Sequence, residues 1–86
     1  MDEGQKLFER MLNTRHGWKE RDLEILYSSF GFAAKESTRH RKYWHPQRPE
    51  LYAFVPRHRS VKAVYVASAI KLILRLKEIQ QNESKK

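Results

Sequence analysis

The 86-residue sequence predicts one α+β domain, residues 1–86, in which two helices, three antiparallel strands and a last helix follow one another. Hydrophobic residues recur every three or four positions before Gly31 and again after Ser60, the spacing of a helix with one buried face. Between these regions, short aromatic and apolar runs are separated by prolines and polar residues, a pattern typical of strands and turns. A chain of this length is expected to hold a single hydrophobic core.

Two helices are predicted before Gly31. The first, at residues 5–13, precedes the main folded segment at residues 18–79, and its apolar side consists of Leu7, Phe8, Met11 and Leu12. The apolar stripe of the second helix consists of Leu23, Leu26, Tyr27 and Phe30. Gly31 is expected to end this helix, because glycine readily adopts the left-handed conformation that closes helix C-termini.

Three short strands are predicted next, at residues 32–36, 40–45 and 51–55, and they should pair as an antiparallel meander. Residues 46–49 include two prolines. Because proline donates no hydrogen bond to a sheet, these four residues should form the turn between the second and third strands.

Successive side chains of a strand point to opposite faces of its sheet, which divides the second strand into two sets. The sets are His40, Lys42 and Trp44 on one face, and Arg41, Tyr43 and His45 on the other. Three aromatic residues of the second and third strands compete for the core: Tyr43, Tyr52 and Phe54. We place Tyr43 and Phe54 there.

The last helix gives the clearest pattern in the chain. Its apolar stripe consists of Val66, Ala69, Ile70, Ile73 and Leu76. Ser60 is the expected N-cap, and the width of the stripe predicts that this helix buries against the sheet. The polar residues 81–86 are expected to fray.

The composition limits the possible classes of protein. The chain has no cysteine, which excludes disulfides and thiolate–zinc sites. Its N-terminus lacks the layout of a secretory signal, and four Lys or Arg interrupt the apolar residues 61–79 before they reach bilayer length. We therefore expect a soluble, cytoplasmic protein without a membrane partner.

The positive charge is concentrated in the middle third of the chain. Residues 35–62 hold eight Lys or Arg and two Glu, a net charge of +6, while the whole chain carries +8. Within them, residues 37–46 combine cations with adjacent aromatic residues and two histidines. Cations bind phosphates, aromatic rings stack on unpaired bases, and histidine exchanges protons near neutral pH. This segment predicts a nucleic-acid partner, RNA first of all.

Residues 18–79 also contain a series of short motifs in a distinctive order. They are Gly31-Phe32 at a helix end, His40 opening the second strand, Tyr43 three residues later, His45-Pro46, and Val55-Pro56-Arg57-His58 before the last helix. In this order and spacing the chain resembles the HicA-type toxins, the RNA-cleaving members of toxin–antitoxin pairs. Its additional N-terminal helix is similar to that of longer members of the family.

The resemblance implies a fold like a double-stranded RNA-binding domain, with helices on one face of the sheet and the other face open to ligand. It also implies that His40 is the catalytic residue, that mRNA is the substrate, and that a HicB-type antitoxin binds and masks the toxin. Family members usually carry Gly-Ser directly before this histidine, whereas this chain has Thr38-Arg39. The difference removes a flexible glycine and adds a cation.

The chemistry of RNA cleavage fits the same segment. RNA carries its own nucleophile, the 2′-OH, so an enzyme needs a base, cations that offset the developing phosphorane charge, and an acid for the leaving oxygen. His40 is the predicted base, and the predicted RNA contacts are Arg39, Arg41, Lys42, Trp44, Arg57, His58 and Arg59. His58 is also the candidate acid.

No cofactor is expected, and a metal site is disfavoured because no two histidines have the helical i, i+4 spacing and acidic residues are scarce in the basic segment. Other interpretations stay open for single residues. Trp44 suits a base and a protein interface equally, His45 suits hydrogen bonding at a strand end, and His16 suits a structural role. The alternative to an endoribonuclease is a non-catalytic RNA- or DNA-binding module that uses the same basic hairpin.

Overall fold

A computed structural model describes residues 3–57 and 60–84 of the protein. Its elements are α1 (Glu3–Asn13), α2 (Glu20–Ser29), β1 (Ala33–Glu36), β2 (His40–His45), β3 (Arg48–Pro56) and α3 (Ala63–Ser84). The three strands form one antiparallel sheet in the order β1-β2-β3. The α+β class and the predicted order of elements are therefore confirmed.

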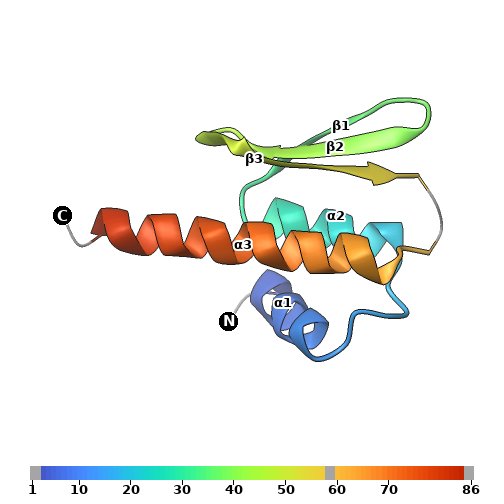
Figure 1. Ribbon diagram of the computed structural model, residues 1–86, viewed down its shortest axis with the longest axis horizontal. Helices are drawn as coiled ribbons and strands as arrows, with labels where there is room; N and C mark the ends of the chain where they lie inside the picture. The colour runs from blue at the N-terminus through green and yellow to red at the C-terminus, as the bar shows by residue number, and fades with distance from the viewer. Residues whose placement is uncertain (1–2, 58–59, 85–86) are drawn as a thin grey trace.

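The molecule is built in three layers (Figure 1). The sheet forms the first layer, α2 and α3 lie side by side against one of its faces, and α1 packs on these two helices from the far side. Within the part of the chain that the structure describes, no helix covers the other face of the sheet. None of the described helices is long and apolar enough to cross a membrane.

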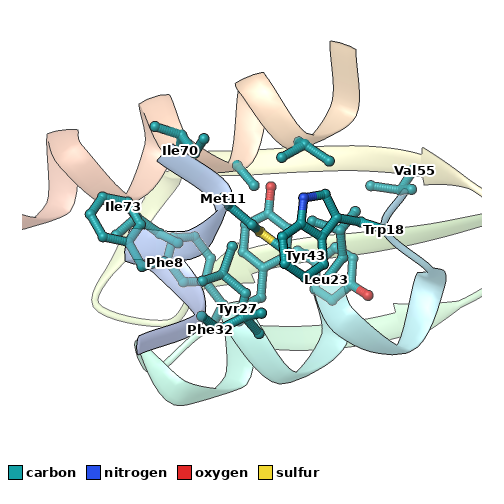
Figure 2. Close-up of a cluster of buried hydrophobic side chains, with 14 of the residues drawn as sticks. Phe8, Met11, Trp18, Leu23, Tyr27, Phe32, Tyr43, Val55, Ile70 and Ile73 are labelled. Atoms are coloured by element: carbon teal, nitrogen blue, oxygen red, sulfur yellow. The ribbon is translucent and has the colours of Figure 1, made fainter. Parts of the chain in front are cut away.

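The core lies between the sheet and the helices, and all three helices contribute to it (Figure 2). The predicted stripe of α3 is fully buried, from Val66 to Leu76. Tyr27 of α2 stacks on Tyr43 of β2 with ring centroids 4.2 Å apart and an interplanar angle of 20°. Since burying one large apolar side chain stabilises a fold by about 1.5–3 kcal/mol, this shared core is what holds the sheet to the helices.

Local signals explain where α2 begins and ends. At its start, the Asp22 carboxylate accepts a hydrogen bond of 2.9 Å from the Lys19 backbone N–H, which would otherwise lack an acceptor. At its end, Gly31 has φ +86° and its N–H donates to the Ser28 carbonyl. The chain can therefore turn directly from α2 into β1, as the sequence predicts.

Several predicted boundaries are wrong. β3 begins at Arg48 because the hairpin turn needs only residues 46–47, and Pro49 is tolerated because β3 is an edge strand. Ser60 forms an antiparallel bridge with Lys19 and does not cap α3, which begins at Ala63.

Two predictions about helix ends and faces also need correction. Residues 81–84 are helical, and Glu83 of α3 forms an ion pair with Arg48, the first residue of β3. Residues 85–86 lie outside the described part of the chain. On α1, Leu12 is 41% exposed, because the face that packs on α2 and α3 is formed by Leu7, Phe8 and Met11.

The placement of Phe54 in the core is wrong as well. The register pairs Arg41 with Val55 and Lys42 with Phe54. Paired residues of an antiparallel sheet share a face, so Phe54 points away from the helices together with Lys42. It is 55% exposed, while Val55 is buried.

Candidate nucleic-acid interface

The sheet face turned away from the helices presents eight side chains in a small grid, which we call the open face. The register assigns to it Ala33 and Lys35 from β1, His40, Lys42 and Trp44 from β2, and Tyr52, Phe54 and Pro56 from β3. None of these eight residues is acidic. The open face therefore combines positive charge with aromatic surface, the two features that bind a single nucleic-acid strand.

Lys42 occupies the middle of this face. Its ammonium nitrogen lies 5.8 Å from the ring centroid of Trp44, 5.6 Å from that of Tyr52 and 5.7 Å from that of Phe54. These distances allow cation–π attraction to each ring. Lys35 is the direct cross-strand partner of Lys42, so two cations sit side by side without an acidic neighbour on the same face.

His40 opens β2 at one end of the open face, and its side chain is exposed. Its backbone is held in a tight loop: the His40 N–H donates to the Ser37 hydroxyl at 3.2 Å, and the Ser37 N–H donates to the His40 carbonyl at 2.8 Å. A hollow of about 400 Å³ adjoins the ring, lined by Lys35, Glu36, Ser37, His40, Lys42 and Phe54. The loop fixes the His40 backbone at the start of β2, next to the positions of Lys35 and Lys42.

Arg41 lies on the opposite face and does not share a surface with His40. It is only 9% exposed, and its guanidinium pairs with Glu24 of α2 at 2.8 Å and with Glu36 of β1. The adjacent Tyr43 and Glu24 raise its pKa because they favour the charged form. Arg41 is therefore not part of the open face, which holds the other predicted RNA contacts of β2, Lys42 and Trp44. It ties β2 to α2 and β1.

The remaining predicted cations differ in their surroundings. Arg57 is exposed, but its guanidinium lies 3.8 Å from Glu20 and 3.5 Å from Glu36, which offset its charge. Arg39 is exposed in the loop before β2, and its carbonyl accepts a hydrogen bond of 3.0 Å from the Arg57 N–H. The other two predicted contacts, His58 and Arg59, lie outside the described residues.

The other two histidines of the described chain do not belong to this face. His45 is buried, its Nδ1 accepts a hydrogen bond of 3.2 Å from the Gln47 N–H, and its ring meets Phe32 edge-on at 5.3 Å. It has the strand-end role expected from the sequence. His16 is exposed in the segment that joins α1 to α2.

Three residues of the open face were missed by the sequence analysis: Lys35, Tyr52 and Phe54. The missing information was the register, because Lys35 and Phe54 flank Lys42 only once the three strands are paired. Tyr52 was considered only for the core, and it is 51% exposed. Pairing the predicted strands residue by residue would have placed Lys35 and Phe54 on either side of Lys42.

Two tyrosines behind the sheet are buried with their hydroxyl groups. Burial raises the pKa of Tyr27 and of Tyr43 above the ordinary value of 10.0, and Arg41 partly opposes the shift at Tyr43. Neither phenol reaches the open face, so they take no part in its chemistry. Over residues 3–57 and 60–84, no group of three or more histidine or acidic side chains is arranged to hold a metal ion.

Comparison with protein-family models, with curated proteins and with solved structures found no match to this chain. The site itself must therefore indicate the function.

Proposed function

We propose that this protein is a metal-independent endoribonuclease that binds mRNA on its open face and uses His40 as the base that activates the 2′-OH. The observation that supports this most directly is the position of His40. It is exposed, its backbone is held by Ser37, and it stands at the end of the open face beside Lys35 and Lys42, with Glu36 as the one acidic side chain lining the same hollow. That combination offers a proton acceptor and phosphate-binding cations at one place.

In the proposed reaction, the His40 imidazole removes the proton from a 2′-OH while that oxygen attacks the adjacent phosphorus. Lys35, Lys42 and the exposed Arg39 offset the charge that develops on the phosphorane oxygens. The bond to the 5′-oxygen then breaks, and this oxygen takes up a proton, for which His58 stays the candidate donor. The products are a 2′,3′-cyclic phosphate and a free 5′-hydroxyl.

The second part of the proposal concerns the biological setting. As a toxin of a type II pair, the protein would act in the cytoplasm and be neutralised by a HicB-type antitoxin. Such a partner would cover the open face with acidic and hydrogen-bonding groups, because lysines without acidic neighbours favour them. A complex whose interface leaves His40 and Lys42 uncovered would contradict this part.

A non-catalytic RNA- or DNA-binding module is the second candidate, and one observation favours it. Arg41 and Arg57 both pair with glutamates, so the positive charge near His40 is smaller than the sequence suggests. A binding surface needs less concentrated charge than a site that stabilises a phosphorane.

A cleavage assay with His40→Ala and the matched control His16→Ala separates the two functions. We expect the parent protein to cut RNA in excess chelator and to leave cyclic or 3′-phosphate ends. His40→Ala should lose about 10²–10⁴ in rate, as expected when a general base is removed, while still binding RNA. His16→Ala replaces an exposed histidine of the segment between α1 and α2, outside the open face, and should cut like the parent. If the parent does not cut, or if His40→Ala cuts equally well, the binding module is the better description.

A further inference from the structure

We infer that the three rings of the open face stack on unpaired bases, so that the substrate is single-stranded RNA and its nucleotides next to the cleaved bond lie over Trp44, Tyr52 and Phe54. This inference rests on the proposed function and adds the substrate class to it. It is carried by features that the proposed chemistry does not use. The cleavage step needs a base and cations, yet the open face also carries three large aromatic rings, of which Tyr52 and Phe54 are exposed and Trp44 is half-buried.

The exposure of these rings is costly unless they have a ligand. Tyr52 is 51% exposed and Phe54 is 55% exposed, although both belong to a strand whose alternate residues are buried in the core. Their ring centroids lie 5.9 Å apart, and the two ring planes make an angle of 78°. A planar base that stacks on one ring would therefore be nearly perpendicular to the other, and both the stacked and the perpendicular arrangement are favourable for aromatic groups.

The position of the rings relative to His40 also fits a bound strand. Side chains on one face of a strand repeat about every 7 Å. The Lys42–Phe54 pair is therefore one such step from His40, and the Trp44–Tyr52 pair is a second step along β2. A strand with its scissile phosphate at His40 would lay its adjacent nucleotides over these two rows.

The cations among the rings favour a nucleic acid over a protein as the occupant. The Lys42 ammonium lies within 6 Å of all three ring centroids, and Lys35 lies across from it. A protein that covers this face has to bring an acidic group for each ammonium, as the proposed antitoxin would, and its side chains do not by themselves call for three aromatic rings around a lysine. A single strand supplies both complements at once, since each nucleotide carries a planar base and a phosphate.

Duplex RNA suits this surface poorly. In an A-form helix the bases stack on each other, and proteins contact the backbone and the 2′-hydroxyl groups of the minor groove. Rings on a flat sheet would then face ribose and phosphate and gain no stacking. A surface built for duplex RNA would instead present polar and cationic side chains at these three positions.

The test measures binding of a short 2′-O-methyl RNA strand, which cannot be cut because it lacks the nucleophile. The comparison ligands are an abasic strand of the same length and charge and a blunt duplex of the same sequence. We expect the base-bearing strand to bind tightest and to quench the emission of Trp44, while the buried Trp18 contributes a constant background. Tyr52→Ala and Phe54→Ala should each weaken its binding about 5- to 150-fold and leave the abasic strand nearly unaffected.

Leu74→Ala is the matched control, because Leu74 is an apolar side chain of α3 that is 48% exposed and lies outside the open face. It should bind all three ligands like the parent. The inference is overturned if the duplex or the abasic strand binds as tightly as the base-bearing strand, or if the ring variants bind normally. It is also overturned if no strand binds at low salt, in which case the rings serve a protein interface.

Failure of this inference can be told apart from failure of the proposed function. If Tyr52→Ala and Phe54→Ala bind normally while His40→Ala abolishes cleavage, the stacking is wrong and the endoribonuclease stands. If Trp44 is quenched by the base-bearing strand alone but the parent cuts no RNA, the stacking stands and the catalysis is wrong.

Discussion

Arg41 and Lys42 offer a direct test of how the structure divides the basic segment. They are adjacent in the sequence and both cationic, but Arg41 pairs with Glu24 and Glu36 behind the sheet while Lys42 lies on the open face. We expect Lys42→Met to weaken the salt dependence of RNA binding and Arg41→Met to leave it unchanged. The sequence alone would predict the same effect for both.

The size of the effect follows from counterion release. Each phosphate contact on a single strand contributes about 0.7 to the slope of log affinity against log salt. Lys42→Met should therefore lower the slope by about 0.7. Between 50 and 200 mM salt, the RNA affinity of Lys42→Met should therefore fall about threefold less than the affinity of the parent protein. Arg41→Met should change the slope by about zero, because its charge is already offset by two glutamates.

Lys42→Met and Arg41→Met should each have nearly the free energy of unfolding of the parent protein, for different reasons. Lys42 is exposed, so its replacement should change the free energy of unfolding by less than about 0.5 kcal/mol. Arg41→Met leaves Glu24 and Glu36 free to return to water, since both side chains are about half exposed, and it should cost about 1 kcal/mol or less. Replacing both glutamates by Gln strands the buried guanidinium and should cost about 3 kcal/mol or more.

The assay is the fluorescence anisotropy of a labelled 2′-O-methyl strand at four or more salt concentrations, with urea unfolding of each variant as the stability control. The reasoning is refuted if Arg41→Met lowers the salt slope as much as Lys42→Met does. It is also refuted if the double glutamate variant is as stable as the parent, because Arg41 would then not depend on these partners.

Three further predictions concern the core and the helix ends. Tyr27→Phe should raise the free energy of unfolding, measured by urea denaturation, by about 1 kcal/mol. The reason is that the buried Tyr27 hydroxyl has no hydrogen-bond partner among the described residues. A loss of stability would show that this hydroxyl has a partner. Since burial raises the pKa of Tyr27 and Tyr43 in the folded state, stability should be complete below pH 10 and fall above it, by up to about 1.4 kcal/mol per pH unit for each tyrosine. Denaturation at pH 9 and 11 checks this, and a smaller fall in Tyr27→Phe is expected. Gly31→Ala should lower the melting temperature more than Gly17→Ala. Both glycines have positive φ, but only at Gly31 would the added Cβ lie 3.2 Å from the His45 ring. Equal losses in melting temperature would contradict this prediction.

The sequence by itself determined the features that depend on local periodicity and local backbone chemistry. The stripe of α3, the end of α2 at Gly31 and the division of β2 into two sets were all predicted and are all present. A helix repeat of 3.6 residues, a strand repeat of two and the left-handed freedom of glycine act within a few residues. The bounds of β2 at His40 and His45 were predicted on the same grounds, and the strand has these bounds.

Only the tertiary structure decided which side chains share the open face and which cations keep their charge for a ligand. β3 has apolar residues at every position from Leu51 to Val55, so its alternation does not show which set is buried. The pairing of β3 with β2 decides which set is buried. The small Ala53 lies opposite Tyr43, whose ring fills the space against Tyr27, so Phe54 points outward beside Lys42. Shifting the register by one residue would exchange the two faces, and register is fixed by packing between segments distant in the sequence.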